Sequence, residues 1–147
     1  MRAVVQRVFS ASVSVDGALV SSIDEGLLVF LGISKEDNEE TAKKLARKVA
    51  GIRIFTDEND KMSRSVTDVG GKILLVSNFT LYGSIRHGYR PDFMKSASGA
   101  VAEPLYEYVL KLLNETVECK GGVFGGDMRV EVVNNGPVTV IVDTDEL

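Results

Sequence analysis

The chain has 147 residues, of which 44% are hydrophobic and 26% charged, a balance typical of one soluble globular domain. Its 17 basic and 21 acidic residues give a formal net charge of −4, which excludes a broad basic surface for long nucleic acids. No apolar run approaches the roughly 20 residues of a membrane helix. Gln6 and Arg7 interrupt the N-terminus before the hydrophobic region of a signal peptide could form, so we expect a cytoplasmic protein. One cysteine, Cys119, and one histidine, His87, exclude a disulfide and a Cys/His zinc site, so no metal or other cofactor is expected.

The first third of the chain is predicted to be a β-meander. Strands are expected over residues 2–9 and 11–15, followed by the hairpin turn Asp16-Gly17 and a return strand over 18–23. Residues 27–33 are continuously apolar, which is typical of a central strand that is covered on both faces.

Helical spacing appears twice in the middle of the chain. It predicts a helix over residues 36–50, capped by Asp37 or Asn38 and ended by Gly51. The apolar face of this helix is expected to consist of Ala42, Leu45, Ala46 and Val49. A second helix is predicted over 98–114, with Pro104 in its first turn or at a kink. Its expected inward face is Val101, Leu105, Tyr108, Val109 and Leu112.

Extended segments complete the predicted fold. Short strands are expected at 52–55, 73–76 and 117–120, and the glycine-rich link 121–126 leads to an alternating strand over 128–132. Residues 134–137 are interpreted as a turn before a last strand at 138–142. These elements predict an α+β fold with a mostly antiparallel sheet or barrel-like β structure, two main helices and a single domain over residues 1–147.

Two polar segments are candidates for chemistry. Ser77-Asn78-Phe79-Thr80 ends a buried strand, where hydroxyl, amide and backbone N–H groups could bind an oxyanion. The simpler interpretation is that these side chains only satisfy the backbone at the strand end. Gly136-Pro137 is interpreted in the same way as a plain hairpin with a trans proline.

The same two segments resemble the signature motifs of the D-aminoacyl-tRNA deacylase family (D-tyrosyl-tRNA deacylases). The first is the run from Ser77 to Tyr82, and the second is the run from Asn134 to Thr139. Further segments resemble the family in order and spacing; they are residues 1–8, 52–55, 61–66, 88–93, 105–106 and 124–128. The resemblance therefore covers the whole chain.

The resemblance implies a hydrolase that cleaves the ester between a D-amino acid and the 3′ end of tRNA, as a form of proofreading. Glycine mischarged onto tRNA is an implied second substrate. The family is a homodimer with active sites shared between subunits, in which a Gly-cisPro motif, here Gly136 and Pro137, excludes L-amino acids. No DNA or membrane partner is expected. Carried over to this chain, Phe124 and Met128 would bind substrate, and Arg7 would contact tRNA or the dimer partner.

The resemblance leaves two mechanisms open for residues 77–80. Thr80 could be the nucleophile, or the substrate's ribose 2′-hydroxyl could assist a water molecule, which we favour because no base is visible beside Thr80. Asn78 stands where the family usually has Gln, which shortens the amide by one methylene. The alternative function is a non-catalytic α+β module that binds a ligand or RNA.

Overall fold

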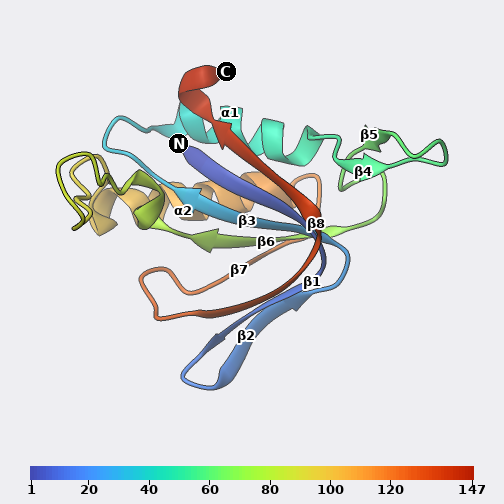
Figure 1. Cartoon of the computed structure of the whole chain (residues 1–147), viewed down its shortest axis with the longest axis horizontal. Helices are drawn as coiled ribbons and strands as arrows, with labels where there is room; N and C mark the ends of the chain where they lie inside the picture. The colour runs from blue at the N-terminus through green and yellow to red at the C-terminus, as the bar shows by residue number, and fades with distance from the viewer.

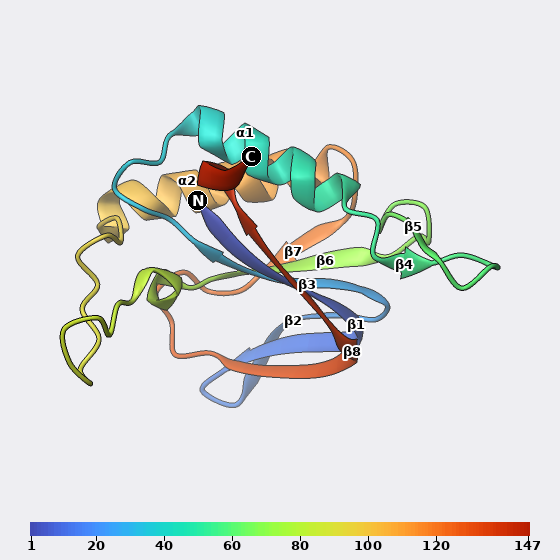
Figure 2. The same ribbon diagram turned by 45° about the horizontal axis from the view of Figure 1, so that its top comes forward.

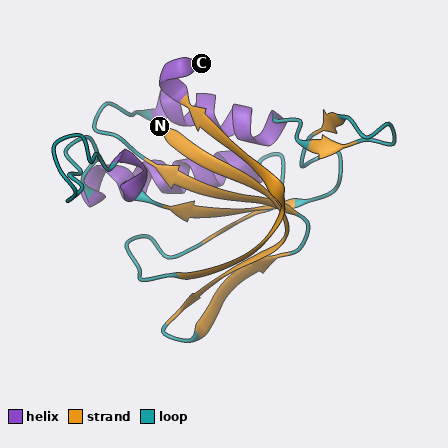
Figure 3. Ribbon diagram, in the orientation of Figure 1, coloured by secondary structure: helices purple, strands orange, loops and turns teal.

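A computed structural model describes all residues, 1–147, as a curved six-stranded sheet, a small two-stranded hairpin and two helices (Figures 1 and 3). The α+β expectation is confirmed. The strands are β1 (Arg2–Val15), β2 (Ala18–Ile23), β3 (Gly26–Gly32), β4 (Phe55–Thr56), β5 (Met62–Arg64), β6 (Lys72–Ser77), β7 (Cys119–Gly121) and β8 (Arg129–Asp143). The helices are α1 (Glu39–Gly51) and α2 (Gly99–Asn114), with short 3₁₀ turns at Phe79–Tyr82 and Thr144–Glu146.

Strand β1 organises the sheet because it pairs with three other strands. It runs antiparallel to β2, β3 and β8, so the two strands predicted at 2–9 and 11–15 are one continuous strand. The predicted hairpin turn is confirmed, with Asp16 and Gly17 both at positive φ, 50° and 78°. This conformation matches the right-handed twist of the flanking strands.

One side of the sheet is parallel. Strand β6 lies parallel to β3 on one side and to β7 on the other, so the sheet is mixed, with antiparallel pairing confined to β1, β2, β3 and β8. Strand β3 is buried along almost its whole length, as its continuous apolar sequence predicts. Its neighbour β6 is equally apolar and ends at Ser77, where the candidate site begins.

Helix α1 follows its predicted pattern closely. Asn38 caps it by accepting hydrogen bonds from the Glu40 and Thr41 amides, while Thr41 accepts one from the Asn38 amide. Its buried residues are the four predicted ones. The strand predicted at 52–55 is wrong, because only Phe55 and Thr56 pair, with β5.

Helix α2 has its predicted length, and its inward face matches the prediction in part. Val109 is buried as predicted, whereas Val101 is 46% exposed. The other three predicted residues, Leu105, Tyr108 and Leu112, are partly buried against the core. The buried residues are Ala102, Tyr106, Val109 and Leu113. The Tyr106 hydroxyl donates to the Leu75 carbonyl of β6 at 2.7 Å, which fixes the rotation of the helix. Pro104 lies inside the helix rather than in its first turn.

Strand β8 is continuous through the segment that the sequence predicts to be a turn. Gln6 pairs with Thr139 and Val8 with Asn134, so residues 135–138 all stand opposite Arg7 alone. The predicted hairpin is therefore a large bulge in one long strand. The Gly136–Pro137 peptide bond within it is cis.

Both helices cover one face of the sheet, as Figure 2 shows. The main core of 23 buried residues fills the space between them and the sheet, and a second cluster of seven lies in the curled part formed by β1, β2, β3 and β6. The chain termini lie close together (Figure 1), where the Met1 ammonium group contacts Asp37 and the Thr144 hydroxyl. Neither helix combines the length and apolarity that crossing a membrane requires.

Candidate functional site

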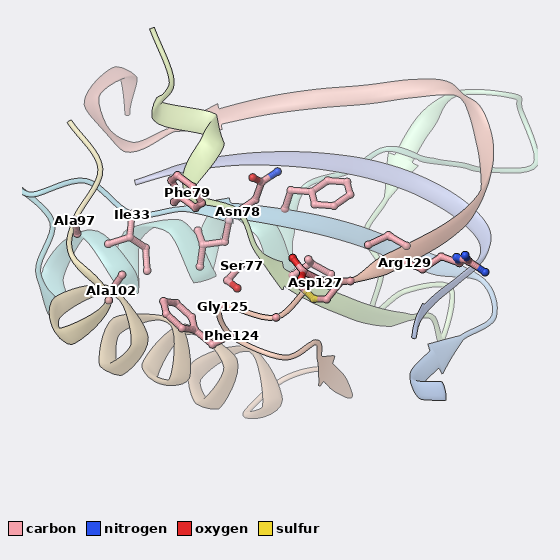
Figure 4. A pocket seen from close by; sticks show the side chains of 17 residues that line it. Ile33, Ser77, Asn78, Phe79, Ala97, Ala102, Phe124, Gly125, Asp127 and Arg129 are labelled. Atoms are coloured by element: carbon pink, nitrogen blue, oxygen red, sulfur yellow. The ribbon is translucent and has the colours of Figure 1, made fainter. Parts of the chain in front are cut away.

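A cavity of about 800 Å³ opens at the carboxyl ends of the parallel strands β3 and β6 (Figure 4). Residues 76–79 form one side, and the first turn of α2 together with residues 124–130 forms the other. Carboxyl ends of parallel strands are common ligand sites, because the chain leaves the sheet there and exposes backbone groups. Most of the lining is apolar, so the few polar groups in it determine what can bind.

The end of β6 and the turn after it carry two of the four polar side chains in the lining, Ser77 and Asn78. The Ser77 side chain points into the cavity (Figure 4), and its hydroxyl makes no hydrogen bond within the chain. The Phe79 N–H also has no partner, although both neighbouring amides do: that of Asn78 donates to the Leu31 carbonyl and that of Thr80 to the Asn78 side chain. Two neutral donors within a span of three residues, both on residues that line the cavity, therefore have no partner within the chain.

Asn78 holds this turn in shape. Its Oδ1 accepts hydrogen bonds from both the amide and the hydroxyl of Thr80, and so caps the 3₁₀ turn at 79–82. The Thr80 hydroxyl thus donates its proton to a neutral amide, which is no base. Residue Phe79 is fixed separately, because its ring packs edge-on against Phe93 with centroids 4.9 Å apart and its carbonyl accepts from Ser96.

The opposite wall is built by the glycine-rich link and α2. Phe124 lies on this wall with its ring 5.9 Å from that of Tyr106, which in turn is anchored to Leu75. Met128 also lines the cavity and packs against the second hydrophobic cluster. Burial raises the pKa of Tyr106 to about 12, so its hydroxyl stays protonated and acts only as a structural donor.

Two charged residues in the lining escape sequence reasoning. Asp127 and Arg129 flank Met128, and Arg129 extends away from Ser77 at the far end of the cavity in Figure 4. The signal that could have found them is their position directly after the glycine-rich link, beside two residues already singled out. Their charges are opposite, so the cavity has no strong net charge.

The structure brings together five of the nine residues that the resemblance implies. Ser77, Asn78, Phe79, Phe124 and Met128 line the same cavity. The other four lie outside the lining; Thr80 is exposed to solvent, and Arg7, Gly136 and Pro137 lie at the β8 bulge.

Arg7 and Asn134 hold the bulge in place. Arg7 donates from Nε to the Asn135 carbonyl at 3.0 Å and from one terminal nitrogen to the Ile54 carbonyl at 2.8 Å. Asn134 Nδ2 donates to the carbonyls of Arg7 and Val138 at 2.9 and 3.2 Å. The bulge is therefore well ordered, although Gly136 and Pro137 themselves are exposed.

The remaining nucleophiles of the chain are outside the cavity. Cys119 is buried, and burial raises the pKa of its thiol to about 12, which agrees with its predicted role as a small hydrophobic residue. His87 lies exposed on a loop and contacts none of the lining. The cavity thus contains no imidazole or thiolate to act as a nucleophile or base, and its free groups suit stabilisation of a developing negative charge.

A mixed sheet with two helices on one face and a cavity at its strand ends defines a small single-domain α+β protein. Comparison with known proteins identifies the family. The model of the D-Tyr-tRNA(Tyr) deacylase family matches residues 4–143, and the chain belongs to this family.

Full-length relatives agree with this assignment. The chain is similar to D-aminoacyl-tRNA deacylases from Clostridium botulinum, 52% identical over 99% of both chains, and from Koribacter versatilis, 52% identical over 98% of this chain and 97% of the relative. Among solved structures, it resembles a c-Myc DNA unwinding element binding protein with a TM-score of 0.92 and 41% identity, covering 97% of this chain and 98% of the other.

Proposed function

We propose that this chain hydrolyses the ester bond that joins a D-amino acid to the 3′-terminal adenosine of tRNA. The observation that carries the proposal is the pair of free donors, the Ser77 hydroxyl and the Phe79 N–H, in an apolar cavity of a chain that belongs to the deacylase family. Water attack on the ester carbonyl forms the C–O bond and places negative charge on the carbonyl oxygen, which such donors stabilise. Collapse breaks the bond to the ribose 3′ oxygen, which takes up a proton and leaves as free tRNA.

The proton transfers are assigned to the substrate rather than to Thr80. The Thr80 hydroxyl donates to Asn78 and lies outside the cavity lining, and no base contacts it. An unassisted threonine is a poor nucleophile near neutral pH, whereas the ribose 2′-hydroxyl lies next to the ester in every substrate of this kind. Asn78, in place of the usual Gln, would then act on the turn rather than on the ester.

This mechanism is tested with two changes. Thr80→Ala should retain at least about a tenth of the wild-type kcat, and a D-aminoacyl-tRNA that ends in 2′-deoxyadenosine should be hydrolysed far more slowly. Trapping of an acyl group on Thr80 would contradict the mechanism. Ser77→Ala is the matched variant within the cavity, and it should lower kcat because it removes a donor without changing the fold.

The remaining pocket residues are assigned to the ends of the substrate. Phe124 offers an aromatic face for the terminal adenine, and Met128 offers an adaptable apolar surface beside it. Gly136 and Pro137 lie outside their own cavity, so we assign them to the cavity of a second copy, where their backbone carbonyls would exclude an L side chain. Glycine has no side chain to exclude, so glycyl-tRNA would also be a substrate.

A homodimer with shared sites follows from this assignment. Its support in the chain is the apolar surface around the bulge, where Phe9 is 59% and Val133 55% exposed, and the outer edge of β8, which pairs with no other strand. Arg7 would shape this interface through its bonds to Asn135 and Ile54. Residues 1–147 would act as one deacylase domain in the cytoplasm, where tRNA is charged.

The decisive experiment compares the D-, L- and glycyl forms of one tRNA, with the mass of the protein measured by sedimentation at the assay concentration. The proposal expects hydrolysis of the D- and glycyl esters, little hydrolysis of the L-ester, and a dimer. No hydrolysis of any ester would overturn the proposed reaction. A fully active monomer would overturn the shared site alone.

DNA binding is a second candidate because the solved relative at 41% identity is described as a DNA unwinding element binding protein. The net charge of −4 weighs against it, since affinity for duplex DNA depends mainly on neutralising phosphates. Duplex DNA that competes with charged tRNA at equal concentration would favour this candidate.

A further inference from the structure

The loop between the 3₁₀ turn and α2 carries exposed apolar side chains and unpaired cations next to the cavity. We call residues 83–95 the basic loop; it is the yellow-green segment that projects at the left of Figure 1. Tyr89 is fully exposed, Met94 is 74% and Ile85 69% exposed, and none of the three packs against the core. Exposed large apolar side chains gathered on one loop are typical of a contact surface.

The charge of the basic loop is opposite to that of the whole chain. It contains Arg86, Arg90 and Lys95 against one carboxylate, Asp92, while the chain has a net charge of −4. None of the three cations takes part in an ion pair, although five such pairs occur elsewhere. The Asp92 carboxylate accepts from the Met94 amide. The loop therefore offers uncompensated positive charge.

The base of the basic loop is fixed beside the 3₁₀ turn at Phe79–Tyr82. Ser84 and Asp92 exchange two backbone hydrogen bonds of 2.9 Å, which close the loop, and the Lys95 carbonyl accepts from the Lys35 amide at 3.1 Å. Phe93 then packs its ring edge-on against Phe79, which lines the cavity. A group bound in the cavity and a group bound on the loop can consequently belong to one extended molecule.

We propose that the basic loop binds the unpaired nucleotides that precede the 3′-terminal adenosine of the tRNA. The inference rests on the proposed function, because it extends the same substrate outward from the cavity. Single-stranded nucleotides present base faces that stack on aromatic rings and phosphates that attract arginine and lysine. Tyr89 supplies the ring, and Arg86, Arg90 and Lys95 supply the cations.

The test compares two substrates that share the ester but not the nucleotides. The first is a D-aminoacyl-tRNA, and the second is the same D-amino acid esterified to adenosine alone. Tyr89→Ala should raise KM for the tRNA ester about tenfold and leave kcat and the hydrolysis of the adenosine ester unchanged. Tyr89→Phe keeps the ring and should stay within about twofold of the wild type on both substrates.

The charge contribution is tested with the double change Arg86→Ala and Arg90→Ala. KM for the tRNA ester should rise and become less dependent on salt. If two phosphate contacts are lost, the slope of log KM against log salt concentration should decrease by roughly 1.4. The matched control is the double change Arg47→Ala and Lys48→Ala, because both residues are also exposed and make no ion pair but lie on α1. An equal effect of this control would overturn the proposed loop contact in favour of a general charge effect.

Two other results also overturn the inference. If the loop variants lose equal activity on the tRNA ester and on the adenosine ester, the loop acts only through the cavity. If they lose activity on neither ester, the loop does not contact the substrate. If the wild type hydrolyses neither ester, the proposed function fails, and the loop is judged by binding alone. A fluorescent RNA hairpin with a four-nucleotide single-stranded 3′ tail should then bind the wild type more tightly than the blunt hairpin does. Equal binding of the two hairpins would refute the loop contact.

Discussion

The glycine at the tip of the β8 bulge allows a quantitative test of how that bulge is held. A Cβ added at Gly136 would lie 1.9 Å from Asn134 Oδ1 and 2.6 Å from its Cγ, so the Asn134 side chain must move away. Moving it breaks the hydrogen bonds from Nδ2 to the carbonyls of Arg7 and Val138. At about 1 kcal/mol for each bond, Gly136→Ala should lower the free energy of unfolding by about 2 kcal/mol.

The assay is urea unfolding followed by circular dichroism, with thermal unfolding as a second measurement. In a chain of this size the expected loss corresponds to a fall in Tm of about 4 to 8 °C. The matched control is Asn134→Ala, which removes the same two hydrogen bonds without adding a methyl group. It should destabilise the protein by a similar amount.

The double variant Asn134→Ala, Gly136→Ala shows whether the added methyl group acts through the Asn134 side chain or through the backbone of the bulge. Because the three atoms nearest to the added Cβ all belong to the Asn134 side chain, the second change should cost almost nothing once that side chain is truncated. The expected coupling between the two sites is therefore about 2 kcal/mol. Additive losses would refute the reasoning, since they would place the cost of the methyl group in the backbone of the bulge.

Three further outcomes are expected. Burial raises the pKa of Asp143, but hydrogen bonds from the Asp145 amide and Arg2 outweigh it and hold the pKa below its ordinary value of 3.8. The ionised Asp143 carboxylate therefore stabilises the fold fully above about pH 4, and this stabilisation is lost as the pH falls through the lower pKa of the folded state. In urea unfolding, the free energy of unfolding of Asp143→Asn should consequently fall less between pH 7 and pH 3 than that of the wild type. Cys119 should react with a thiol reagent at pH 8 only after denaturation, since burial raises its pKa to about 12; rapid labelling of the native protein would contradict its burial. Activity should survive dialysis against a chelator, because no three His, Cys, Asp or Glu side chains are clustered, and loss that one divalent ion restores would contradict this.

The sequence predicted the structure well for elements whose conformation depends on a local pattern of residues. Helix α1 shows this, since its buried face and its Asn38 cap follow from 3.6-residue spacing and from a side chain that bonds its own backbone. The Asp16-Gly17 hairpin and the fully apolar β3 are similar cases. Ser77, Asn78 and Phe79 stand out as a polar segment at the end of a buried strand, and Phe124 and Met128 follow only from the family resemblance. All five line one cavity.

Contacts between distant segments decided the rest. The rotation of α2 depends on Tyr106 reaching a carbonyl of β6, 31 residues away in sequence, so periodicity within the helix found Val109 but missed Tyr106. The continuity of β8 through residues 134–137 depends on its pairing with β1 and on Arg7, although Asn, Gly and Pro locally favour a turn. Local propensities are worth only about 1 kcal/mol per residue, and a long paired strand with buried neighbours outweighs them. The tertiary structure also decided that Asp127 and Arg129 belong to the lining of the cavity, because only folding brings the glycine-rich link close to the end of β6.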